Sequence, residues 1–209
     1  MPLWNVRAHP ERHSPCGFAC EQGMTALARW LIATNICAAR LLLAAENTNE
    51  SIRAFREVAS VLQSPRCLNC HVPDNHPRQG DASHVHTMGV ERGPDGRGAP
   101  YLHCSTCHQD QNSVIEHAPP GALGWRMPGV STPMAWLGLS VAQLCGSLKD
   151  PQRNGNRSGA GLLQHAADDH IVNWGWRPGA GRTLPPISHD RFVAAVREWI
   201  DKGAACPAE

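Results

Sequence analysis

The segment from Cys67 to His108 carries one short motif twice. The first copy is Cys67-Leu68-Asn69-Cys70-His71, and the second, after the 32 residues 72–103, is Cys104-Ser105-Thr106-Cys107-His108. Two cysteines separated by two residues and followed directly by histidine suit covalent haem attachment. The thiols can reach the two vinyl groups of one porphyrin while the adjacent imidazole reaches the iron. The sequence therefore predicts two covalently bound c-type haems.

This prediction gives each motif residue a role. The thiols of Cys67, Cys70, Cys104 and Cys107 would hold the two porphyrins, and the imidazoles of His71 and His108 would each bind one iron. No catalytic residue is predicted.

Two alternatives use the cysteines differently. A four-thiolate zinc site usually has about 15–20 residues between its cysteine pairs, and zinc gives no reason for a histidine directly after both pairs. A thioredoxin-type redox pair is expected within a βαβ pattern, and none surrounds either motif. Both are weaker than the haem interpretation.

The long segment between the motifs offers further iron ligands. Residues 72–100 contain four prolines and five glycines and predict an irregular loop. A loop longer than about 15 residues needs a reason in a compact domain. Ligation by His84 or His86 would supply one, with His86 the first choice. Downstream of the second motif, where monohaem cytochromes place their second ligand, His117 and Met134 are also candidates.

The first 45 residues differ from the rest. Residues 24–45 have an early arginine, a short apolar centre and small residues near the end, as a secretory signal peptide has. We expect translation to begin at Met24 and the mature protein to start between Ala39 and Asn47, although an amphipathic helix of the mature protein is the alternative. The expected organisation is an extension and signal over 1–45 and one domain over 46–209. No stretch approaches the roughly 20 apolar residues that a stable membrane span requires.

Charge and cysteine number add two expectations. A formal net charge of +1 argues against nucleic acid as a partner recognised by bulk charge. Nine cysteines are present, and three of them precede residue 46. The haem motifs use four, so Cys145 and Cys206 remain as an even pair, which predicts a disulfide bond in an exported protein.

Helical periodicity appears in four segments. We expect a helix that is capped by Ser51 and ends before Pro65, one that begins at Ser140 with Gln143 completing a capping box, one over about 159–167, and one capped by Ser188. The predicted fold class is mainly α, a loop-rich dihaem cytochrome c domain with short helices. Arg153 or Arg157, in the polar loop 152–158, could pair with a haem propionate.

Two resemblances follow from these motifs. Residues 67–108 are similar to the small dihaem subunit of periplasmic nitrate reductases, in which both irons have two histidine ligands, but nothing like residues 109–209 belongs to that subunit. The segments NWGWRPG, GRTLPPISHDRF and REWIDKGAACP resemble a group of exported dihaem cytochromes that are companion subunits of isoquinoline 1-oxidoreductase-type molybdenum hydroxylases. That resemblance implies such a hydroxylase as redox partner.

The expected function is therefore electron transport in the periplasm. The protein would carry single electrons between a partner oxidoreductase and the respiratory chain, as an electron-transfer protein or subunit more than as an enzyme. The alternative is a dihaem peroxidase-like enzyme, in which one iron lacks a second protein ligand so that substrate can bind.

Overall fold

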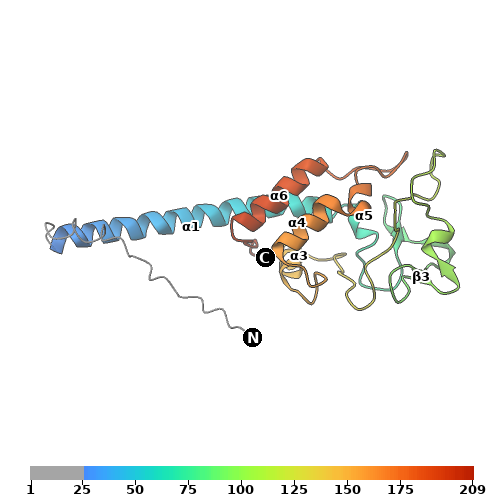
Figure 1. Cartoon of the computed structure of the whole chain (residues 1–209), viewed down its shortest axis with the longest axis horizontal. Coiled ribbons are helices and arrows are strands. Elements are labelled where there is room, and N and C mark those ends of the chain that lie inside the picture. The colour runs from blue at the N-terminus through green and yellow to red at the C-terminus, as the bar shows by residue number, and fades with distance from the viewer. Residues whose placement is uncertain (1–25) are drawn as a thin grey trace, which may run out of the picture. The chain divides into compact units, whose positions relative to one another are not determined.

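The computed structural model describes residues 26–209 and is mainly α (Figure 1). The chain divides into two compact units with the boundary between Ala44 and Ala45. Within the described residues, no helix combines the length and the apolar content needed to cross a membrane. The expected translation start at Met24 lies outside the described residues.

The first helix, α1, spans Ala26–Leu62, so the expected helix start at Ser51 is wrong. Ser51 instead lies buried inside the helix, where its hydroxyl donates to the Trp199 carbonyl at 2.9 Å and accepts from the Ala205 amide at 2.9 Å. A serine before an apolar run resembles an N-cap, but these partners lie at the other end of the chain. Tertiary contacts therefore satisfy this hydroxyl, and the helix continues through the polar residues before it.

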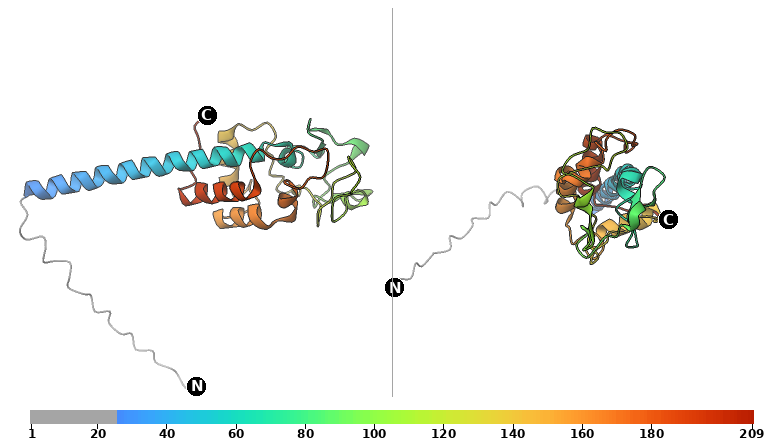
Figure 2. Two further views of the ribbon diagram at one scale, coloured as in Figure 1. Left: turned by 90° about the horizontal axis from the view of Figure 1, so that it is seen from above. Right: turned by 90° about the vertical axis from the view of Figure 1, so that its right-hand side faces the viewer.

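The last turns of α1 build a core with three later helices, α3 (Val141–Lys149), α4 (Gly159–Asp168) and α6 (His189–Asp201). Helices α4 and α6 run side by side next to this part of α1 (Figures 1 and 2). At the centre, the rings of Phe55 and Trp199 have centroids 5.0 Å apart, and both side chains are almost fully buried.

Local capping signals set the starts of α3, α4 and α6, and the sequence predicted the caps at Ser140 and Ser188. Ser140 and Gln143 form a reciprocal capping box, and the hydroxyls of Ser158 and Ser188 each accept an amide from the first turn. Two short helices were not predicted, α2 (Pro65–Leu68) and α5 (His170–Trp174). Proline fits the first turn of α2 because its missing amide hydrogen needs no partner there.

Residues 72–106, which include the predicted loop and the start of the second motif, contain two very short antiparallel hairpins and two 3-10 turns. The hairpins pair β1 (Arg78–Gln79) with β2 (His84–Val85) and β3 (Gly98–Ala99) with β4 (Leu102–His103), and the turns are η1 (Thr87–Gly89) and η2 (Cys104–Thr106). Gly98 has a φ of +100°, and a Cβ there would lie 2.5 Å from the Leu102 carbonyl oxygen, so the second hairpin requires glycine.

A buried arginine holds the loops together where apolar side chains are few. Arg92 is 1% exposed, and its guanidinium donates to the carbonyls of Val72, Asp74 and Pro128 at 2.8, 2.9 and 2.8 Å. Val72 and Asp74 follow the first motif, whereas Pro128 lies beyond the second. The guanidinium thus supplies hydrogen-bond donors to backbone carbonyls that lie outside helices and strands.

The structure contains the predicted disulfide between Cys145 and Cys206, whose Cα atoms are 5.6 Å apart. It joins α3 to the segment after α6. The cysteine count thus identified the correct pair.

Candidate functional site

The two motifs adopt the same backbone turn. In the first, the His71 amide donates to the Cys67 carbonyl at 3.1 Å, and in the second the His108 amide donates to the Cys104 carbonyl at 2.9 Å. A hydrogen bond between residues four apart is one turn of helix, which brings the first cysteine and the histidine to the same face. Among the described residues the four motif cysteines are all free thiols.

Each motif histidine is oriented by a backbone carbonyl. Nδ1 of His71 lies 2.8 Å from the Met134 carbonyl oxygen, and Nδ1 of His108 lies 2.7 Å from that of Pro120. A carbonyl can only accept, so Nδ1 carries the proton and Nε2 keeps its lone pair. Metal-binding histidines usually show this arrangement, because the second hydrogen bond fixes both the tautomer and the direction of the ring.

The environment keeps both imidazoles neutral. Burial lowers the pKa of His71 to about 3 and also lowers the pKa of His108. A tryptophan stacks on each ring: Trp136 lies on His71 with centroids 3.4 Å apart and planes at 2°, and Trp125 lies on His108 at 4.4 Å and 6°. Neutral, rigidly held imidazoles are ready to bind a metal.

The first motif opens into an apolar cavity in the helical core. The cavity volume is about 110 Å³, and Cys67, Cys70 and His71 line it together with apolar side chains of the core helices. Well-packed cores contain few voids larger than a water molecule, and this cavity is several times the volume that one water molecule needs. A large apolar group is thus expected between these helices.

Two buried polar atoms on the cavity wall have no hydrogen-bond partner within the described part of the chain. They are Nε of Arg66 and Nε1 of Trp136. Buried donors are nearly always satisfied, so these two indicate a ligand with acceptor atoms. Haem has a large apolar ring, which suits the apolar lining, and carboxylates, which could accept from these two donors. The two thiols suit its covalent attachment, and the imidazole suits its iron. The residues present therefore fit a haem.

The thiols of the first motif do not resemble a redox pair. Burial raises the pKa of Cys67 to about 12 and that of Cys70 to about 11. Reactive pairs have lowered thiol pKa values instead. After burial, the next contribution to the raised pKa of Cys70 is repulsion from Cys104, so the two motifs lie near each other.

At the second motif a loop histidine faces the motif histidine. The rings of His86 and His108 have centroids 6.2 Å apart and planes at 64°. Nδ1 of His86 lies 2.8 Å from the Thr87 carbonyl oxygen, which leaves its Nε2 free as well. Two imidazoles on opposite sides of one metal have centroids about 6 Å apart, from two metal–nitrogen bonds of about 2 Å and about 1 Å within each ring.

The other predicted ligands lie elsewhere. His84 is exposed on β2 and packs near Gly80, and His117 is 73% exposed with Nε2 3.6 Å from Glu116. Met134 lines the first cavity, but its carbonyl accepts from Nδ1 of His71, so its backbone lies behind that ring, away from Nε2. The structure thus brings together His86 and His108, whereas His84 and His117 are exposed.

Sequence reasoning gave no role to His165, which lines the first cavity from α4. A signal was present, because His165 and Asp169 are four residues apart and a carboxylate commonly supports a metal-binding histidine. Of the two arginines suggested for a propionate, Arg157 lines the cavity.

No group of three or more His, Cys, Asp or Glu side chains placed to hold a metal ion occurs in residues 26–209. A four-thiolate zinc site would need all four motif thiols in one such group. A haem iron takes at most two ligands from the protein, so haem requires no group of that kind.

Comparisons of the chain with protein families, with curated proteins and with solved structures found no match.

Proposed function

We propose that this chain is a dihaem c-type cytochrome that transfers single electrons. Cys67 and Cys70 would hold one haem and Cys104 and Cys107 the other, with His71 and His108 on the irons. When bound, each haem would supply a one-electron iron couple. The protein supplies attachment, ligand orientation and burial.

The observation that carries this proposal is the pairing of His86 with His108. Both rings have Nδ1 hydrogen-bonded to a carbonyl, and their separation of 6.2 Å suits two ligands of one iron. An iron with a strong ligand on each face stays low-spin in both oxidation states, so electron transfer needs little rearrangement. A peroxidase-like enzyme would instead need an open face.

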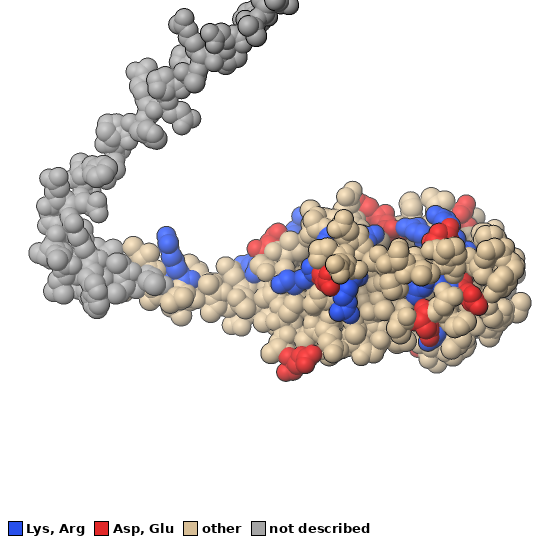
Figure 3. Space-filling view, turned by 90° about the horizontal axis from the view of Figure 1, so that it is seen from below, with Lys and Arg blue, Asp and Glu red and all other residues tan. Residues whose placement is uncertain are grey.

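The partner and the compartment are part of the proposal. We infer an exported, periplasmic protein that passes electrons between a partner oxidoreductase, such as a molybdenum hydroxylase, and the respiratory chain. The disulfide supports an oxidising compartment. On the face drawn in Figure 3, Lys and Arg are interspersed with Asp and Glu, which suits a partner recognised by shape and local pairing.

Two covalent haems per chain are the expected result of purification from a host with c-type haem maturation. Haem staining of a denaturing gel and the ratio of iron to protein measure this. The two thioether bonds to each haem should survive acid extraction. A ratio near one, or haem that is extracted by acid, would contradict the proposal.

Replacing His86 by alanine is expected to convert one of the two haems from low-spin to high-spin, because it removes one of two facing imidazoles. The altered haem should bind carbon monoxide, which competes for the open face. Optical and paramagnetic resonance spectra measure both changes, and the haem ratio should stay at two because attachment is untouched.

His84→Ala is the matched control, since this histidine lies in the same hairpin but is exposed. Its spectra should equal those of the wild type. A spin change in His84→Ala and none in His86→Ala would reverse the assignment. Turnover of peroxide by the wild type would favour the enzyme.

A further inference from the structure

We propose that His165 is the second iron ligand at the first motif and that Asp169 is the positioning residue that holds it. This inference rests on the proposed function, because it concerns the first of the two haem sites. Among the described histidines, the cavity at the first motif is lined by two, His71 and His165. They come from different elements, the motif itself and α4.

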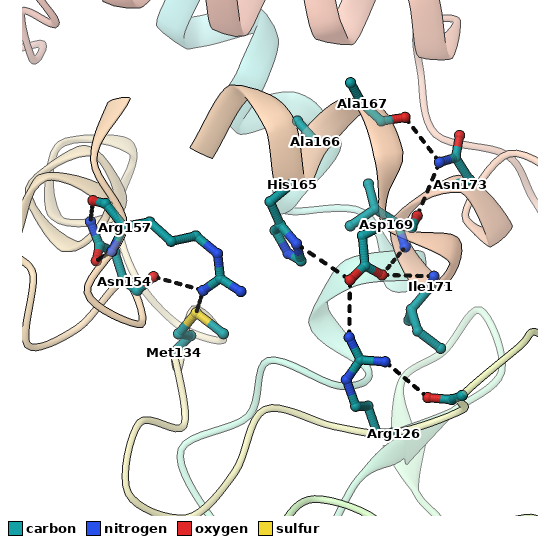
Figure 4. Close-up of polar contacts among 12 residues, drawn as sticks. Arg126, Met134, Asn154, Arg157, His165, Ala166, Ala167, Asp169, Ile171 and Asn173 are labelled. Atoms are coloured by element: carbon teal, nitrogen blue, oxygen red, sulfur yellow. Dashed lines mark hydrogen bonds and ion pairs between the residues drawn. The ribbon is translucent and has the colours of Figure 1, made fainter. Parts of the chain in front are cut away.

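Asp169 orients the His165 ring (Figure 4). Its Oδ2 lies 3.4 Å from Nδ1 of His165 and 3.0 Å from the guanidinium of Arg126. With Nδ1 facing the carboxylate, Nε2 is the nitrogen left for a metal. His71 is arranged in the same way, with a carbonyl in place of the carboxylate.

The carboxylate is itself fixed. Asp169 is the N-cap of α5, where its Oδ1 accepts from the amides of Ile171 and Val172 at 2.8 and 3.4 Å. One oxygen therefore holds the start of a helix and the other faces the histidine. A side chain held at both oxygens can set the direction of a ring.

Neighbouring groups are less suitable as the second ligand. Met134 lies with its backbone behind the His71 ring, and its sulfur is 3.8 Å from the guanidinium of Arg157 (Figure 4). The nearby His189 has Nε2 2.8 Å from the Ala166 carbonyl oxygen, where it donates, and it lines another cavity. His165 therefore remains as the candidate, because it lines the first cavity and keeps Nε2 for a metal.

The two proposed sites then differ in the group that faces Nδ1 of the second ligand, which is His86 at one site and His165 at the other. Nδ1 of His86 donates to a neutral carbonyl, whereas Nδ1 of His165 faces a carboxylate. A charged acceptor makes an imidazole more electron-donating, which favours oxidised iron. The first haem should therefore have the lower reduction potential, and electrons should collect at the second motif.

His165→Ala in the haem-loaded protein tests the ligand. We expect about half of the haem to become high-spin and to bind carbon monoxide, with the haem ratio still two and with low-spin spectra restored by added imidazole. His170→Ala, which alters an exposed neighbour, is the control and should change nothing. His165→Met should keep the haem low-spin with a raised potential, because methionine is a weaker donor.

Asp169→Asn tests the positioning role and keeps an N-cap residue. We expect the reduction equilibrium of one haem to shift at least tenfold toward the reduced form, which is about 59 mV for one electron, with the other haem unchanged. Asp169→Glu should recover part of the shift. A purely structural role would leave both potentials in place.

Failure of this inference is distinct from failure of the proposed function. If two haems are bound but neither His165→Ala nor His165→Met alters any spectrum, His165 is not a ligand and the dihaem proposal stands. If half of the haem is already high-spin in the wild type and His86→Ala makes the other half high-spin, the open iron is the first one and His165 does not bind it. If no covalent haem is bound, the proposed function itself is wrong.

Discussion

Replacing both Cys67 and Cys70 by alanine is expected to leave one haem per chain and a destabilised helical core. These thiols lie on the wall of the apolar cavity, where they are joined by apolar side chains of α1, α3, α4 and α6. In the loaded protein the porphyrin would fill that space and form part of the core. Without covalent attachment the core must close around a void or bind haem weakly.

The expected loss of stability can be estimated from the known effect of removing a single buried side chain. Removing one buried leucine side chain costs about 3–5 kcal/mol, so a loss of about 5 kcal/mol or more is expected here. For a domain of this size, that lowers the melting temperature by about 10–20 °C. Calorimetry and the haem ratio measure both effects.

The matched variant replaces Cys104, the first residue of η2, and Cys107, which follows it, and neither of them lines this cavity. It too should bind one haem, but its melting temperature should fall much less, because the helical core keeps its own haem. Equal destabilisation by the two double variants would show that the first haem is not a core element.

Local signals located α3, α4 and α6 but not the start of α1. Ser140, Ser158 and Ser188 each stand before an apolar run and accept an amide of the first turn, a contact between residues three apart. Such contacts depend on sequence alone. Ser51 has the same appearance, yet its partners are Trp199 and Ala205, and only tertiary structure brings these near.

The iron ligands show the same division. The motif spacing alone proposes His71 and His108 as ligands, because attachment and ligation would be encoded within five residues. The choice between His84 and His86 depends on the hairpin, in which His84 pairs with Gln79 and lies exposed while His86 follows the strand and faces His108. Sequence reasoning did not single out His165, because a histidine on a helix looks the same whether it faces solvent or, as here, lines a cavity.

The disulfide was predicted by counting, and its removal should have the second large effect. Replacing Cys145 and Cys206 together by serine opens a loop between residues 61 apart. In the chain-entropy treatment, closing such a loop stabilises the folded state by about 4 kcal/mol. The variant should therefore melt about 8–16 °C lower than the wild type.

The surrounding contacts show why this end of the chain depends on the bond. Beside Cys206, the Ala205 amide donates to Ser51 and the Ala205 carbonyl accepts from Nε1 of Trp199 at 3.1 Å. The disulfide thus fixes the segment after α6 against α1 and α3. When it is opened, these hydrogen bonds lose the constraint that keeps their partners in place.

Urea denaturation of the double serine variant, of the oxidised wild type and of the reduced wild type measures this contribution. The variant and the reduced wild type should unfold at similar urea concentrations, both below the oxidised protein, and the haem ratio should stay at two because neither cysteine belongs to a motif. The variant is also measured with the same reductant, which controls for any effect of reducing the irons. A difference of less than about 1 kcal/mol between the variant and the oxidised protein would mean that the packing of α1, α3 and α6 holds this segment without the bond.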